Sequence, residues 1–169
     1  MHKVPFVSQR TYAFPRIACG VAATMMLLKF HFRRKRVPSY RDLRKALGVY
    51  VLPCGSGRRR SALGVVPDDV TRYFRQHAIA YRATRRNTRT MWTILERRLR
   101  RAPAMVAMGG NESRWGPAGH WIVVIDVSAN TVSFLDPQYL PTHKRPTTMS
   151  LARFRRQWDG SSVQIVGFH

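Results

Sequence analysis

The sequence predicts an α+β fold in which helices from the first half of the chain pack on an antiparallel sheet from the second half. Three observations support this prediction. The run 19–30 is apolar on nearly every side, as in a helix buried in a core. After Pro103 the pattern changes to short runs rich in β-branched and aromatic residues. Two of these runs, 121–127 and 131–135, are separated by a short polar segment at 128–130, which predicts a β-hairpin.

Capping residues and apolar spacing place three further helices in the first two thirds of the chain. Ser39 is a typical N-cap in front of a helix over 40–47, and Gly48 ends that helix. The sequence Pro67-Asp68-Asp69 begins the next helix, because proline and acidic residues favour the first helical turn. Thr90 caps a third helix, in which an apolar stripe faces one side and arginines face the other.

The remaining segments complete the expected order. The stretch 52–64, rich in Gly, Ser and Arg, is the clearest loop. The other expected elements are an extended segment over 4–9, strands over 79–82 and 104–108, a helix over 151–158 and a closing strand over 163–168. The chain has no internal repeat and no long linker, so we expect a single domain over residues 1–169.

Basic residues dominate the charge, with 30 Lys+Arg against 8 Asp+Glu and a net charge of +22. Hydrophobic residues make up 44% of the chain, which excludes a disordered basic tail. We expect the arginine runs to form solvated surfaces that attract acidic partners; they lie at 33–36, 58–60, 85–86, 97–98, 100–101 and 155–156. Nucleic-acid binding is less favoured than docking to an acidic protein, because the aromatic residues mostly follow the core periodicity.

Cysteine and histidine usage predicts neither a disulfide scaffold nor a metal site. The two cysteines, Cys19 and Cys54, do not have CxxC spacing, and the six histidines do not cluster at ligand spacing. The longest apolar run, 17–28, is far shorter than the roughly twenty residues of a membrane span. It also lies too far into the chain for a signal peptide, so we expect a soluble protein without cofactor, metal or membrane partner.

Three residues predict nucleophilic chemistry. Cys19 stands at the start of the buried helix, where the helix dipole favours a thiolate. His120 opens the first strand of the hairpin and Asp136 follows the second. If the strands pair symmetrically about Ala129, Ile122 lies opposite Asp136, and His120 and Asp136 share one face as diagonal neighbours roughly 7 Å apart. A shift of one residue would place them on opposite faces.

Each of these residues also has a purely structural interpretation. In that interpretation, Cys19 is a buried core cysteine, His120 is a hydrogen-bonded strand histidine, and Asp136 is a turn aspartate in front of a proline. Cys54 is a rival nucleophile, but it lies in a loop without a helix start behind it. Asp126 is a rival acid, but it is six residues from His120 along the same strand, roughly 20 Å away.

The sequence resembles the papain-like peptidases of the bacteriocin-leader, or double-glycine, type. The resemblance rests on Gln9, Cys19-Gly20, Gly119-His120-Trp121 and Asp136-Pro137, which occur in the family's order. It extends over most of the chain, because the helix from Pro67, the strand before the histidine loop and the last helix and strand also fall in matching order. A papain-like fold is the architecture that this resemblance implies.

By this resemblance, Cys19 is the nucleophile, His120 the general base and acid, and Asp136 the group that orients the imidazole. Gln9 would donate a hydrogen bond to the oxyanion together with the backbone N–H of Cys19. Gln9 lies ten residues before Cys19, a longer spacing than the family commonly has. Gln138 and Asn111 are weaker candidates for the same role.

We therefore expect a cysteine protease that hydrolyses peptide bonds of a protein substrate, either acidic or associated with nucleic acid, through a thioester intermediate. Exporter-type members of the family are fused to membrane and ATPase segments, which we do not find in this sequence. Together with the basic charge, this favours an antibacterial toxin or effector that a secretion system delivers into the cytoplasm of a target cell and that an acidic immunity protein neutralises. An amidase or glutamine deamidase with the same triad, and an inactive basic binding module, remain alternatives.

Overall fold

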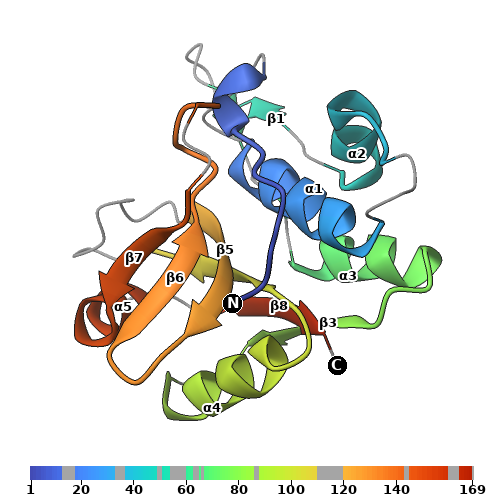
Figure 1. Ribbon diagram of the computed structural model, residues 1–169. Coiled ribbons are helices and arrows are strands. Elements are labelled where there is room, and N and C mark those ends of the chain that lie inside the picture. Colours follow the sequence, from blue (N-terminus) through green and yellow to red (C-terminus); the bar gives the residue numbers. More distant parts are fainter. Residues whose placement is uncertain are drawn as a thin grey trace.

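The computed structural model is an α+β structure in which helices cover both faces of one antiparallel sheet (Figure 1). It describes residues 1–12, 18–32, 37–48, 51–53, 60–62, 65, 67–85, 88–109, 120–142, 145–159 and 164–168. The helices are η1 (Gln9–Thr11), α1 (Cys19–His31), α2 (Tyr40–Ala46), α3 (Pro67–Gln76), α4 (Thr88–Leu99) and α5 (Leu151–Asp159). The strands are β1 (Val51–Pro53), β2 (Arg60–Ala62), β3 (Tyr81–Arg85), β4 (Ala104–Met108), β5 (His120–Val127), β6 (Thr131–Leu135), β7 (Thr147–Ser150) and β8 (Gln164–Phe168).

The main sheet has six strands in the order β3-β8-β4-β5-β6-β7, and every neighbouring pair is antiparallel. Alternate residues of β5 point to opposite faces, as the two-residue period of a strand requires. Trp121 and Val123 enter the core that contains α1, whereas Ile122 and Val124 enter the core that contains α4 and α5. This arrangement confirms the expected fold class, with the helix that starts at Cys19 packed on the antiparallel sheet.

Helix α1 forms the centre of the larger core. All its residues from Cys19 to Leu28 are buried, which agrees with an apolar pattern that has no polar side. The helix contacts β5 and β4 of the sheet and α2 on its other side. Among the helices in the described residues, none is long and apolar enough to cross a membrane.

The β5–β6 hairpin has the predicted register at its open end but not near its turn. Val123 pairs with Leu135 and Val124 with Phe134, as pairing symmetric about Ala129 requires. Between Val124 and Asp126 the register shifts by one residue, so that Asp126 pairs with Ser133. A β-bulge in β5 therefore separates the turn from the end of the hairpin that carries His120.

Several boundaries differ from the sequence-based prediction. The segment 52–64, expected as a loop, contains parts of the paired strands β1 and β2, whose three-residue length leaves no alternation to detect. Strand β7 was not predicted, because its side chains are mostly polar and only Met149 is buried. Helix α4 begins at Thr88 rather than after Thr90, and β3 begins at Tyr81 rather than at Ile79.

Arg98 corrects the expectation that the run 97–98 is wholly solvated. Its side chain is 6% exposed and donates hydrogen bonds to the carbonyl of Arg82 and the hydroxyl of Thr84. Burial is the largest of the effects that lower the pKa of Arg98, to about 10. The side chain lies against Gly167 of β8, where a Cβ atom would sit 2.6 Å from Arg98 Cδ. Arg98 thus joins α4 to the β3–β8 edge of the sheet.

Candidate active site

Cys19 is the first residue of α1 and lies next to the strand that begins at His120. Its side chain is 8% exposed. The following residue, Gly20, allows this close approach, because a Cβ atom there would lie 2.6 Å from Val65 Cβ and 3.0 Å from Trp121 Cδ1. The Trp121 indole donates a hydrogen bond to the carbonyl of Val65 at 3.1 Å, which fixes the wall against which the start of α1 packs.

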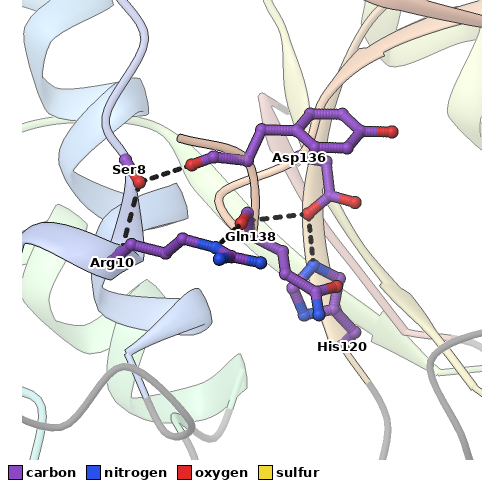
Figure 2. A network of polar contacts seen from close by, with 6 residues as sticks. Ser8, Arg10, His120, Asp136 and Gln138 are labelled. Atoms are coloured by element: carbon purple, nitrogen blue, oxygen red, sulfur yellow. Dashed lines mark hydrogen bonds and ion pairs between the residues drawn. The ribbon is translucent and has the colours of Figure 1, made fainter. Parts of the chain in front are cut away.

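His120 and Asp136 meet across the open end of the β5–β6 hairpin. His120 Nε2 lies 2.6 Å from Asp136 Oδ1, and both side chains are buried, at 7% and 1% exposure (Figure 2). The two residues lie on the same face because the register at this end of the hairpin is the one predicted. Since the carboxylate engages Nε2, Nδ1 is the ring nitrogen left for the hydrogen bond between His120 and Cys19.

The turn after β6 holds the Asp136 carboxylate in place. Asp136 Oδ1 accepts a second hydrogen bond from the Gln138 N–H at 2.9 Å, and the Asp136 carbonyl accepts one from the Tyr139 N–H at 3.1 Å. Proline at the second position of such a turn is favoured because its φ is already fixed. Asp136 is therefore both the turn aspartate of the structural interpretation and the partner of His120.

Cys19 and His120 change each other's protonation. Burial raises the pKa of the Cys19 thiol, but the hydrogen bond and charge of His120, with hydrogen bonds from the backbone of Trp121 and Gly20, outweigh it and lower this pKa overall. Burial lowers the pKa of His120, but hydrogen bonds and charge interactions with Asp136 and Cys19 raise it to about 9. At neutral pH these shifts favour a thiolate beside an imidazolium, a form in which sulfur is a strong nucleophile.

Gln9 lies in η1, which packs against α1, and its side chain is 7% exposed. Its backbone N–H donates to the carbonyl of Pro137 at 2.8 Å, directly after Asp136. Gln138, the weaker candidate, lies in the same turn and uses its backbone N–H to hold Asp136. Gln9 is thus tied to the turn that carries Asp136, although it lies ten positions before Cys19 in the sequence.

The other candidates are not brought to this place in the described residues. Asp126 lies near the opposite end of β5 and faces Ser133 across the hairpin. Cys54 and Asn111 fall outside the described residues. In the part of the chain that the structure describes, no group of three or more His, Cys, Asp or Glu side chains is placed to hold a metal ion.

Sequence reasoning missed two residues near this site, Ser8 and Arg10. Their side chains contact the turn after Asp136 (Figure 2). A short polar segment gives no periodic signal, so only the fold reveals what these side chains contact. The sole available signal is Ser8 as a capping residue, and its hydroxyl does accept a hydrogen bond from the Arg10 N–H.

Comparison with known proteins finds the same fold in peptidases. No family model and no curated protein sequence matches the chain. A C39-like peptidase structure from Bacillus anthracis is similar over 100% of this chain and 96% of its own length, with a TM-score of 0.70 and 14% identity. The peptidase domain of the Streptococcus transporter ComA, involved in quorum sensing, is similar over 100% of both chains, with a TM-score of 0.60 and 16% identity.

A double-glycine-motif protease from an AMS/PCAT transporter, solved in complex with a leader peptide, is also similar. It matches over 99% of this chain and 94% of its own, with a TM-score of 0.60 and 17% identity. The chain therefore has the fold of the papain-like C39 and double-glycine peptidase domains over its full length.

Proposed function

We propose that this chain is a cysteine peptidase, formed as one domain by residues 1–169, in which Cys19 is the nucleophile, His120 the general base and acid, and Asp136 the group that orients the imidazole. The observation that carries the proposal is the buried contact between His120 and Asp136, 2.6 Å long, beside a thiol whose pKa His120 lowers. A carboxylate at 1% exposure would be costly to bury without such a partner.

In the proposed reaction, Cys19 Sγ attacks the carbonyl carbon of the scissile bond and the carbonyl electrons move to oxygen. The backbone N–H of Cys19 and the side-chain amide of Gln9 donate to that oxyanion. The C–N bond then breaks as the amine takes the proton from His120, which leaves a thioester on Cys19. Water, deprotonated by His120, attacks the thioester, and the carboxylic acid leaves as Cys19 returns to the thiolate.

The structural relatives favour a peptide as the substrate class, since all three are peptidases and one was solved with a leader peptide. Incubation with a library of peptides from a bacterial proteome, in ¹⁸O-labelled water, tests this directly. We expect wild-type protein to produce new carboxyl termini that carry ¹⁸O. Cys19→Ala protein should produce none, because no thioester can form.

Two controls make this experiment decisive. Asp126→Asn removes a carboxylate from the same strand but far from His120, and it should leave cleavage unchanged. Asp136→Ala should reduce it strongly, because the imidazole then loses the group that orients it. A mass change of about one unit on glutamine side chains without new termini would instead identify a deamidase, and the absence of any product would overturn the proposal.

We further propose that the substrate or a regulating partner is an acidic protein. Among the side chains that the structure describes in α4, in α5 and just after α4, six exposed ones are arginines and one, Glu96, is a carboxylate; the arginines are Arg97, Arg100, Arg101, Arg153, Arg155 and Arg156. A groove of about 520 Å³ lies between α4, α5 and the β5–β6 hairpin, and Arg100 and Arg155 are among the residues that line it.

Two measurements test this partner class and the role as an antibacterial toxin. A variant with Arg→Gln at positions 100, 153 and 155 should bind poly-glutamate more weakly than a control variant with Arg→Gln at positions 41, 44 and 75. If the wild-type protein binds duplex DNA more tightly than poly-glutamate, the partner is instead a nucleic acid.

Expression in a bacterial cytosol should arrest growth for wild-type protein and not for Cys19→Ala. Equal growth of the two strains would contradict the toxin role but not the peptidase.

A further inference from the structure

Three consecutive residues at the start of η1 hold three consecutive carbonyls of the turn after Asp136. The Ser8 hydroxyl donates to the Tyr139 carbonyl at 2.5 Å. The Gln9 N–H donates to the Pro137 carbonyl at 2.8 Å. Arg10 Nε donates to the Gln138 carbonyl at 2.5 Å. We call these three hydrogen bonds the 8–10 clamp; Figure 2 shows the two that Ser8 and Arg10 make.

The N–H groups and the carbonyls of the turn after Asp136 therefore bind different parts of the chain. Its N–H groups at Gln138 and Tyr139 point back to Asp136, one to the carboxylate and one to the carbonyl. Its carbonyls at positions 137–139 point the other way and accept the clamp. The carboxylate that contacts His120 and the segment that carries Gln9 are thus held on opposite sides of one short piece of backbone.

Ser8 is built into this arrangement. It is 4% exposed, and its hydroxyl oxygen accepts a hydrogen bond from the Arg10 N–H at 3.2 Å while donating to Tyr139. The Ser8 carbonyl also accepts from the Thr11 hydroxyl at 2.9 Å. One serine thus fixes the start of η1 and joins it to the turn, so that Gln9 enters the fold with its backbone already oriented.

We infer that Ser8 and Arg10 are positioning residues, which place Gln9 for the oxyanion from the Asp136 turn rather than from the chain that leads to Cys19. This inference rests on the proposed peptidase function. It explains how Gln9 reaches its place despite the long spacing to Cys19, because the clamp sets its position from the Asp136 turn. Asp136 keeps its own hydrogen bonds within the turn, so loss of the clamp displaces Gln9 and leaves the contact with His120.

Two thiol probes separate these effects. Iodoacetamide alkylates a thiolate by direct displacement and needs no oxyanion donor. A peptide aldehyde ending in glycinal instead forms a hemithioacetal. The bond from Sγ to the aldehyde carbon forms, the C=O π electrons move to the aldehyde oxygen in the oxyanion position, and that oxygen takes a proton from the His120 imidazolium. The ratio of aldehyde affinity to alkylation rate therefore reports on Gln9 independently of the Cys19–His120 pair.

We expect Ser8→Ala and Arg10→Gln each to weaken aldehyde binding about tenfold or more, approaching the loss in Gln9→Ala, since misplacement of an oxyanion donor costs factors of this size or larger. The rate of alkylation and its pH profile should stay at wild-type values in all three. Ser8→Thr retains the hydroxyl and should restore aldehyde binding. Arg75→Gln, which removes an exposed arginine from α3, is the matched control and should change neither probe.

The possible failures are distinguishable. If wild-type protein is alkylated no faster than a free thiol and does not bind the aldehyde, the proposed function itself is wrong. If wild-type protein reacts with both probes while Ser8→Ala and Arg10→Gln bind the aldehyde normally, only the clamp inference is overturned. Arg10 is exposed, so its variant should fold, and it keeps the test valid if the buried Ser8→Ala variant does not fold.

Discussion

At the scale of single residues, the candidate site depends on opposing effects on two ionisable groups. Burial by itself would make Cys19 a neutral thiol and His120 a neutral imidazole, because a low-dielectric environment disfavours charge. Their mutual attraction and the Asp136 carboxylate reverse both outcomes. These shifts favour a charged pair, which the contact between His120 and Asp136 across the hairpin supports.

Asp136→Asn should therefore lower the pKa of His120 from about 9 toward the ordinary 6.5, because the hydrogen bond with Asp136 is the first of the influences that raise it. A group whose pKa is higher in the folded than in the unfolded protein stabilises the fold at pH values below its unfolded-state pKa. This contribution is lost as the pH rises through its folded-state pKa. The stability difference between wild type and variant should thus be fully present below pH 6.5 and should shrink as the pH rises through about 9.

NMR titration of the His120 imidazole measures its pKa, and urea unfolding across this pH range measures the difference in stability. Asp126→Asn is the control, because it lies on the same strand but near the opposite end of β5. An unchanged His120 titration in Asp136→Asn would show that the carboxylate does not set this pKa.

Gly20→Ala should destabilise the protein, although alanine is the better helix former by about 1 kcal/mol. The added Cβ would lie 2.6 Å from Val65 Cβ and 3.0 Å from Trp121 Cδ1, so the wall beside Cys19 must move. Overpacking of this kind costs about 1–3 kcal/mol. Chemical denaturation measures whether the free energy of unfolding falls or rises in the variant. A more stable variant would mean that the side chains of Val65 and Trp121 move aside easily. The rate of Cys19 alkylation would then stay unchanged.

At the scale of elements, local signals identified the helices better than they identified their ends. Helix α2 begins after Ser39, whose hydroxyl accepts from the Asp42 N–H at 3.2 Å, as a capping residue should. The end of α3 is unusual, because Ala78 adopts a φ of 56° where glycine is normally found. There the Ile79 N–H donates to the Phe74 carbonyl at 2.9 Å and closes the helix.

Ala78→Gly should raise the stability of the chain. The left-handed conformation costs a residue with a Cβ about 1–2 kcal/mol, and the extra freedom of glycine in the unfolded chain offsets part of that gain. A net increase of about 0.5–1 kcal/mol follows, to be measured by thermal and urea unfolding. Ala80→Gly, two residues away at an exposed position, is the control and should not stabilise.

At the scale of the whole molecule, the net charge of +22 acts on stability as well as on partners. Like charges at this density repel one another in the compact state more than in the expanded one. Added salt screens this repulsion, because the Debye length falls from about 30 Å at 0.01 M to about 10 Å at 0.1 M. The protein should therefore become more stable as sodium chloride increases over this range.

Thermal unfolding at a series of salt concentrations checks this prediction. Sucrose at matched osmolality serves as the control for effects of the solvent that do not involve charge. A melting temperature that falls with salt would mean that favourable ion pairs outweigh the repulsion.

The sequence by itself was sufficient for the fold class, for the buried helix that begins at Cys19, and for the hairpin that brings His120 and Asp136 to one end. Each of these depends on a local period or on a register that short-range pairing sets. Only the tertiary structure decided that Arg98 is buried, that a bulge separates the two ends of β5, and that Ser8 and Arg10 hold the Asp136 turn. These features depend on which segments meet in space, and contacts between distant segments leave no periodic signal along the chain.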